Sequence, residues 1–93
     1  MQLVWRPLAL SDREAIMEYI AEDNPVAAIE LDERFEEEAD KALQNPTLYK
    51  ISHRYSRTRE IVVSKSYVMV YRVDEAGKVL EILRVLHTSR KWP

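Results

Sequence analysis

Apolar residues recur every three or four positions across residues 25–45, which is the spacing of one face of an α-helix. Asn24 is a suitable N-cap, and Pro25 suits the first helical position because its missing N–H would be unpaired there in any case. We expect this helix to end near Asn45-Pro46. The apolar stripe consists of Ala28, Leu31, Phe35, Ala39 and Leu43.

A first helix is predicted over residues 8–22. Its apolar face contains one polar interruption, Asp12, and runs through Leu8, Asp12, Ile16, Tyr19 and Ile20. Ser11 and Glu14 match the capping box, in which the serine oxygen accepts from the first turn while the glutamate reaches back, so the helix could also begin at residue 11. Since only a few residues separate the two helices, they should form an antiparallel hairpin.

Beyond residue 47 the pattern changes to that of β-strands. Three strands are predicted at 59–64, 67–73 and 79–87, where β-branched and aromatic residues concentrate. The short links between them make an antiparallel meander. The middle strand is almost continuously apolar, so we expect it to be central and covered on both faces. Gly77, in the second link, should supply a positive φ.

Two shorter segments complete the predicted fold. Residues 2–5 have the composition of an edge strand, and residues 49–58 of a short strand followed by a polar loop. The expected class is α+β, with an N-terminal helical hairpin packed on one face of a small antiparallel β-sheet. The other face of the sheet and the C-terminal tail stay available.

Length and composition restrict the possible functions. A chain of 93 residues predicts a single domain with a thin core, so function is expected on an open surface. The absence of cysteine excludes disulfides, thiolate catalysis and cysteine–zinc sites. His53 and His87 are the only histidines, and we expect neither a metal site nor a cofactor. No apolar run approaches the roughly 20 residues of a membrane span, and no signal peptide is evident, so a soluble cytoplasmic protein is expected.

The net charge of −2 hides a division along the chain. Residues 1–40 contain three basic and twelve acidic residues, a balance of −9, whereas residues 41–93 contain eleven basic and four acidic residues, a balance of +7. The overall charge argues against nucleic-acid binding, but the second half alone favours an anionic partner. Attraction between acidic helices and a basic sheet is the alternative explanation.

Basic side chains gather where the predicted strands begin and end. Clustered arginines bind anions bidentately and can stabilise charge in phosphoryl transfer, and a histidine beside them can act as an acid or base. The alternative is that the strand arginines pair with Glu60, Glu75 and Glu81. The candidate target-binding residues are Arg59, Arg72, Arg84, His87, Arg90, Lys91 and Trp92.

The register of the second link decides which candidates share a face. If Val73 pairs with Lys78, Arg72 lies on the face of His87. If the link is one residue longer, Arg72 shares the face of Arg84 instead, because a slip of one residue exchanges the faces of a strand.

Three stretches together resemble the RelE/ParE superfamily of toxins from type II toxin–antitoxin modules, and are most similar to its ParE-like members. They are "YIAEDNPVAAIEL" at 19–31, "TREIVVSKSYVMVYRV" at 58–73 and "VLEILRVLHTSRKWP" at 79–93. The resemblance implies the same hairpin-on-sheet fold, a cognate antitoxin and a toxin–antitoxin hetero-oligomer. It also implies one of two targets: ParE-like toxins inhibit DNA gyrase, whereas RelE-like toxins cut mRNA on the ribosome.

The chain departs from the RelE-like pattern at two positions. RelE-like chains carry an arginine directly after the tyrosine that opens the central strand, where this sequence has Val68 after Tyr67, and their C-terminal tyrosine is missing here. The resemblance therefore implies gyrase inhibition through the C-terminal basic surface. Two alternatives remain: an mRNA endonuclease with Arg84 and His87 as catalytic residues, and a non-toxic remnant that only binds antitoxin.

Overall fold

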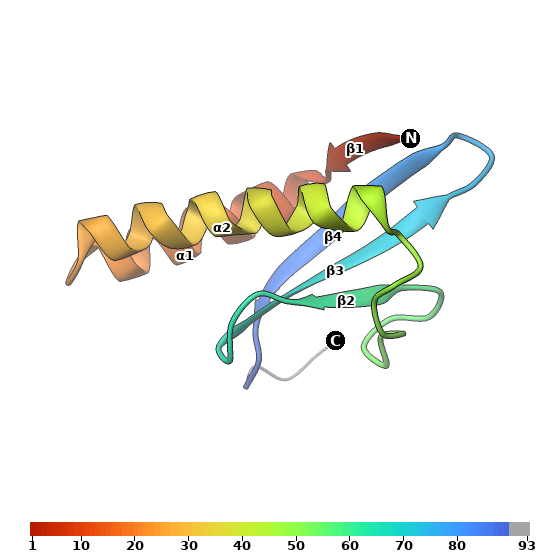
Figure 1. The fold of residues 1–93 in the computed structure, drawn as a ribbon. Helices are drawn as coiled ribbons and strands as arrows, with labels where there is room; N and C mark the ends of the chain where they lie inside the picture. The colour runs from red at the N-terminus through yellow and green to blue at the C-terminus, as the bar shows by residue number, and fades with distance from the viewer. Residues whose placement is uncertain (90–93) are drawn as a thin grey trace.

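The chain forms two layers, a helical hairpin and a four-stranded sheet (Figure 1). This computed structural model describes residues 1–89. Both helices lie on one face of the sheet, and the turn that joins them extends beyond it. The predicted α+β class and hairpin are confirmed. The elements are β1 (Gln2–Trp5), α1 (Pro7–Ala21), α2 (Pro25–Gln44), β2 (Arg59–Val62), β3 (Tyr67–Asp74) and β4 (Val79–His87).

The strands lie in the order β1-β4-β3-β2. The β2–β3 and β3–β4 pairs are antiparallel, as the meander predicts, and β1 takes the edge position expected for residues 2–5. However, β1 runs parallel to β4, from Gln2 beside Val79 to Trp5 beside Ile82. The sheet is therefore mixed rather than wholly antiparallel. Parallel neighbours need a long connection, and the hairpin with two further strands supplies it.

The second helix forms as its sequence predicts. The side chain of Asn24 accepts a hydrogen bond from the backbone N–H of Ala27 at 3.0 Å, and Pro25 opens the first turn. The predicted stripe faces the sheet, with Phe35 and Ala39 fully buried. Local capping and the apolar stripe agree, so both ends of α2 could be located in advance.

The first helix begins before the predicted capping box. Arg6 is its N-cap residue and makes no side-chain capping bond, so Ser11 and Glu14 lie inside the helix. The helix begins this early because it follows β1 directly. The N–H of Arg6 still donates to the carbonyl of Ile82 in β4, at 3.0 Å. Pro7 then starts the helix at once, because its fixed φ suits the first turn.

The buried face of α1 also differs from the predicted stripe. Leu8 and Tyr19 are exposed, whereas Arg13 is buried. Burial of a guanidinium is tolerated when its charge is fully compensated. The guanidinium of Arg13 contacts Asp32 at 2.8 and 2.9 Å, Glu36 at 3.1 Å and the face of the Trp5 ring at 4.4 Å. These contacts join β1, α1 and α2.

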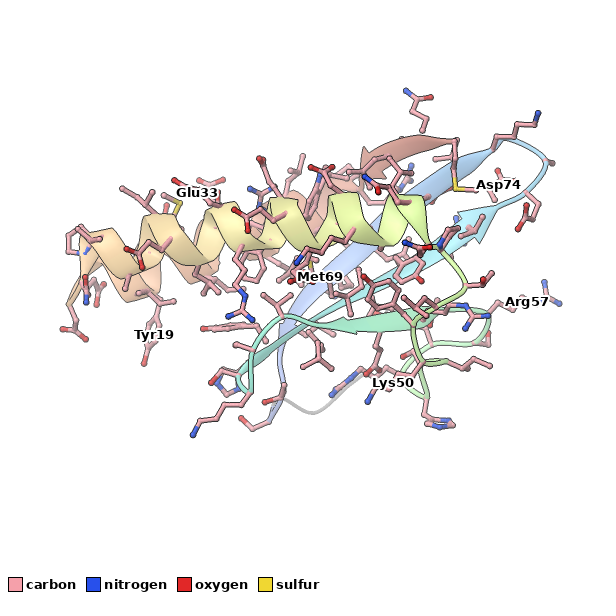
Figure 2. The ribbon with its side chains drawn as sticks, viewed as in Figure 1. Tyr19, Glu33, Lys50, Arg57, Met69 and Asp74 are labelled. Carbon is pink, nitrogen blue, oxygen red and sulfur yellow. The ribbon has the colours of Figure 1, made fainter. Side chains whose placement is uncertain are left out.

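The central strand β3 is covered on both faces, as predicted. Met69 and Tyr71 point toward the helices and join Phe35 in the main core, and Figure 2 shows Met69 between the two layers. The opposite face carries a smaller cluster of Val68, Val70 and Leu86, with Tyr55 from the loop between α2 and β2 packed against it. That loop replaces the short strand expected at 49–58 with a single bridge, between Ile51 and Arg59.

The β3–β4 turn corrects the expectation for Gly77. Its φ is not positive, and the positive φ of 52° in this turn belongs to Lys78. Gly77 is instead placed where space is short, because a Cβ there would lie 3.0 Å from Oδ2 of Asp74. The glycine N–H donates to Oδ1 of the same aspartate at 3.1 Å.

Tyr71 should make the fold sensitive to alkaline pH. Burial raises the pKa of its phenol from 10.0 to about 12, and the hydroxyl donates to the carbonyl of Pro46 at 2.5 Å. Below pH 10 the phenol is neutral in both states. Between pH 10 and 12 the unfolded chain loses its proton first, so the free energy of unfolding should fall by up to about 1.4 kcal/mol per pH unit.

Urea unfolding from pH 8 to 11.5 measures this slope. In Tyr71→Phe the baseline stability should drop by about 1 kcal/mol through loss of the hydrogen bond, and the slope should become shallower than in the parent. Equal slopes in the two proteins would contradict the assignment to Tyr71.

Candidate functional site

A bulge interrupts β4 where β1 stops beside it. Tyr71 pairs with Ile82, but Val70 pairs with Arg84, so Leu83 is the extra residue. Bulges bend a strand and redirect its side chains. Because β1 pairs with β4 only as far as Ile82, the outer edge of β4 beyond this point faces α1.

Asp12 of α1 binds this edge of β4. Its carboxylate accepts two hydrogen bonds from the Arg84 guanidinium, at 2.8 and 2.9 Å, and a third from the backbone N–H of Val85 at 2.9 Å. Hydrogen bonding to Asp12 raises the pKa of Arg84 further, against the opposing effect of burial. We term this arrangement of Asp12 and Arg84 the Asp12–Arg84 clamp. It links an acidic helix to the basic sheet, as the division of charge suggested.

His87 lies at the end of β4, beyond the bulge. Its ring packs edge-on against that of Tyr67, opposite it on β3, with centroids 5.3 Å apart. Nδ1 accepts from the backbone N–H of Ser89 at 3.2 Å, which places the proton of the neutral ring on Nε2. Figure 2 shows Tyr19 projecting away from α1. The pocket beside His87 has a volume of about 490 Å³ and is lined by Asp12, Ile16, Tyr19, Tyr67, Val85 and His87, among others.

The structure groups Arg72 with Arg84 and places His87 elsewhere. Val73 pairs with Leu80 rather than Lys78, a shift of two residues that by itself leaves the faces unchanged. The bulge at Leu83 then shifts the register by one more residue, which puts Arg84 on the face of Arg72, and both arginines line one pocket. His87 lines the other pocket. Arg84 and His87 are three residues apart on a strand, which separates their backbones by about 10 Å.

The strand arginines pair only in part with the glutamates that the alternative explanation named. Arg72 donates to Glu81, directly opposite on β4, at 3.2 and 3.3 Å. Arg59 donates to the carbonyl of Tyr49 at 2.6 Å. The buried Glu60 instead accepts from Ser52 at 2.6 Å and pairs with Arg54 and Lys50 at 3.2 and 3.7 Å.

The remaining candidates, Arg90, Lys91 and Trp92, lie outside the described residues. Thr88, just before them, holds the end of β4 to the β2–β3 turn. Its backbone N–H donates to the carbonyl of Ser66 and its hydroxyl to the carbonyl of Lys65, both at 2.8 Å. A truncation that is meant to spare the sheet must therefore leave Thr88 in place.

Sequence reasoning did not include Asp12 or Tyr67 in the site. Asp12 had a visible signal, because it is the one polar residue in the apolar stripe predicted for the first helix. Tyr67 had no comparable signal, since its contact with His87 depends on the β3–β4 register.

Within residues 1–89, no group of three or more His, Asp or Glu side chains is placed to hold a metal ion. In the same part of the chain, no helix is both long enough and apolar enough to cross a membrane.

Comparison with solved structures identifies the fold. A chain of the chromosomal ParDE toxin–antitoxin system from P. aeruginosa has a TM-score of 0.81 at 22% identity, over 94% of this chain and 95% of that chain. The isolated E. coli RelE toxin has a TM-score of 0.66 at 18% identity, over 97% of this chain and 86% of that chain. The fold is that of the RelE/ParE toxins.

Sequence comparison identifies the family. The family described as "ParE toxin of type II toxin-antitoxin system, parDE" matches residues 3–92. Toxin RelE2 of Caulobacter vibrioides is 34% identical over 89 residues, covering 96% of this chain and 97% of that protein. The chain belongs to the ParE family of type II toxins, and the predicted RelE/ParE membership is confirmed.

Proposed function

We propose that this toxin arrests growth by binding DNA gyrase and does not cleave nucleic acid. The observation that carries the proposal is the Asp12–Arg84 clamp. An endonuclease needs an acid or base within hydrogen-bond reach of the reacting group, with fixed positive charge beside it. Here Arg84 is bound bidentately by an internal carboxylate, and His87 lines a different pocket. Membership of the ParE family supports the same target.

Val68 gives further support. It occupies the position that RelE-like toxins fill with arginine, and it is buried against Val70 and Leu86 beneath Tyr55. A positive charge at this position would stabilise a cleavage transition state by about 3–4 kcal/mol, by analogy with one oxyanion-hole donor. The uncharged side chain of Val68 cannot make that contribution.

We also propose a cognate antitoxin that neutralises the toxin in the cytoplasm as a hetero-oligomer. The end of the hairpin exposes large apolar side chains, with Tyr19 at 74% and Val26 at 64%. Such groups are typical of protein interfaces. The structural relatives include the ParDE system and an intact E. coli RelBE toxin–antitoxin complex.

Induction of the protein in cells tests the target. We expect plasmid DNA to lose negative supercoiling before the rate of translation falls, and co-expression of the neighbouring reading frame to restore growth. Loss of translation before any change in supercoiling would favour the mRNA endonuclease. No growth arrest, together with retained antitoxin binding, would favour the non-toxic remnant.

His87→Ala separates a binder from a nuclease. In a binder the change removes one side chain packed against Tyr67. Such a loss should cost less than about 1 kcal/mol, or less than about fivefold in the inducer needed for growth arrest. In a nuclease it would remove the acid or base and abolish cleavage. Primer extension on cellular mRNA provides the second readout, and growth arrest that is lost together with mRNA cleavage would contradict the proposal.

A further inference from the structure

A pocket of about 490 Å³ lies apart from His87, at the junction of β1, α1 and the sheet. Arg6 directly precedes α1, Arg72 lies in β3 and Arg84 lies in β4. Three residues with hydroxyl groups come from the loop between α2 and β2. We term this site the arginine pocket, and its polar lining consists of Arg6, Arg72, Arg84, Tyr55, Ser56 and Thr58.

Positive charge exceeds negative charge around the arginine pocket. Glu81 is shared by two arginines, at 3.2 Å from Arg72 and 3.9 Å from Arg6. Asp12 compensates Arg84. Three guanidinium groups therefore face two carboxylates, which leaves one positive charge in excess. The first turn of α1, which borders the pocket and has no acidic residue, adds the positive end of a helix dipole.

One arginine is fixed and two can reach a ligand. Arg84 is held by the Asp12–Arg84 clamp, whereas the side chains of Arg6 and Arg72 are each 53% exposed. Both contact the same oxygen, Oε2, of Glu81. Each guanidinium carries more N–H donors than this oxygen can engage, so a second carboxylate can bind beside Glu81.

The apolar part of the lining distinguishes a peptide from a nucleic acid. Pro7, Leu8 and Leu83 complete the wall, and Leu8 is 60% exposed. A phosphate backbone would leave these groups uncovered, whereas a peptide can present an apolar side chain next to a carboxylate. The net charge of −2 and the acidic helices also oppose nucleic-acid binding.

We infer that the arginine pocket binds an acidic segment of a protein partner. One Asp or Glu carboxylate of that segment lies between Arg6 and Arg72, and a neighbouring apolar side chain covers Leu8. Glu81 is then an internal competitor, because it occupies donors that the partner's carboxylate needs. The inference does not depend on gyrase as the target, since a toxin with another target would have the same pocket.

Selection of peptides tests the inference. A displayed library of random 12-residue peptides is selected against the full chain, and affinities of the selected peptides are measured by fluorescence polarisation. We expect peptides that combine acidic and apolar residues. Arg72→Gln should weaken them about tenfold, because it removes a charge-assisted hydrogen bond. Glu81→Gln should strengthen them about threefold, because it removes the competing carboxylate.

Lys65→Gln is the matched control. It changes net charge by the same amount as Arg72→Gln, but it lies in the β2–β3 turn outside the pocket, so affinity should stay within about twofold. Unfolding midpoints show that each variant is folded. Three results would overturn the inference. They are selection of no acidic peptides, a peptide affinity that neither Arg72→Gln nor Glu81→Gln changes, and Arg72-dependent binding of a single-stranded oligonucleotide that is tighter than binding of the peptides.

Discussion

Replacing Asp12 with alanine should lower the free energy of unfolding by about 3 kcal/mol. The change leaves the guanidinium of Arg84 without its counter-ion and the N–H of Val85 without an acceptor. Breaking a buried ion pair by removing one partner costs about 3–5 kcal/mol. The lower end applies because the Arg84 side chain is 20% exposed. Urea unfolding followed by circular dichroism measures the loss.

Two variants control for trivial effects of the alanine. Glu14→Ala removes an exposed carboxylate from the same helix and should change stability by less than about 0.5 kcal/mol. Adding Arg84→Leu to Asp12→Ala should recover much of the loss, because no unpaired charge then remains. If Asp12→Ala costs under about 1 kcal/mol, the pair behaves like a surface ion pair and the clamp contributes little to stability.

Phe35→Ala should destabilise the protein by about 3–5 kcal/mol. Phe35 is 1% exposed and lies in the main core between α2 and the sheet, where its ring meets that of Tyr67 edge-on at a centroid distance of 6.0 Å. Its removal leaves a cavity that the surrounding side chains can fill only in part. Since small domains have total stabilities of about 5–15 kcal/mol, a large part of the stability should be lost.

Thermal and urea unfolding should both detect this loss. Tyr19→Ala is the control, because it also deletes an aromatic ring but from a side chain that is 74% exposed. Its stability should change by less than about 0.5 kcal/mol, while binding of the proposed antitoxin should weaken. Equal destabilisation by Phe35→Ala and Tyr19→Ala would contradict the placement of the core.

The second helix could be predicted from the sequence because each local signal agreed. The N-cap and the first turn depend only on neighbouring residues, Asn24 and Pro25. The apolar stripe lies on a single face of one helix. The meander of 67–73 and 79–87 was predictable for the same reason. The parallel placement of β1 was not, because nothing within residues 2–5 specifies which strand they join.

The first helix shows how tertiary contacts override a local pattern. Ser11 and Glu14 fit a capping box, yet Arg6 is still hydrogen-bonded to Ile82 of β4 and the helix starts directly after it, at Pro7. Arg13 would be assigned to the surface on its charge alone. Its burial depends on Asp32 and Glu36 of the other helix, which no spacing within α1 reveals.

The candidate site was predicted as a set of residues but not as an arrangement. Arg72, Arg84 and His87 were identified from their positions at strand ends. Their grouping depends on the bulge at Leu83, which changes the alternation of β4 and has no local sequence signal. The partner of Arg84 is Asp12, 72 positions away in the sequence, so only the folded chain could identify the clamp.

Titration of the purified toxin into two assays tests the central proposal most directly. One assay follows supercoiling of relaxed plasmid DNA by DNA gyrase with ATP, and the other follows the length of an mRNA during translation on ribosomes. We predict that supercoiling stops as the toxin becomes stoichiometric with gyrase, while the mRNA stays intact. Cleavage of the mRNA at concentrations that leave supercoiling unchanged would contradict the proposal.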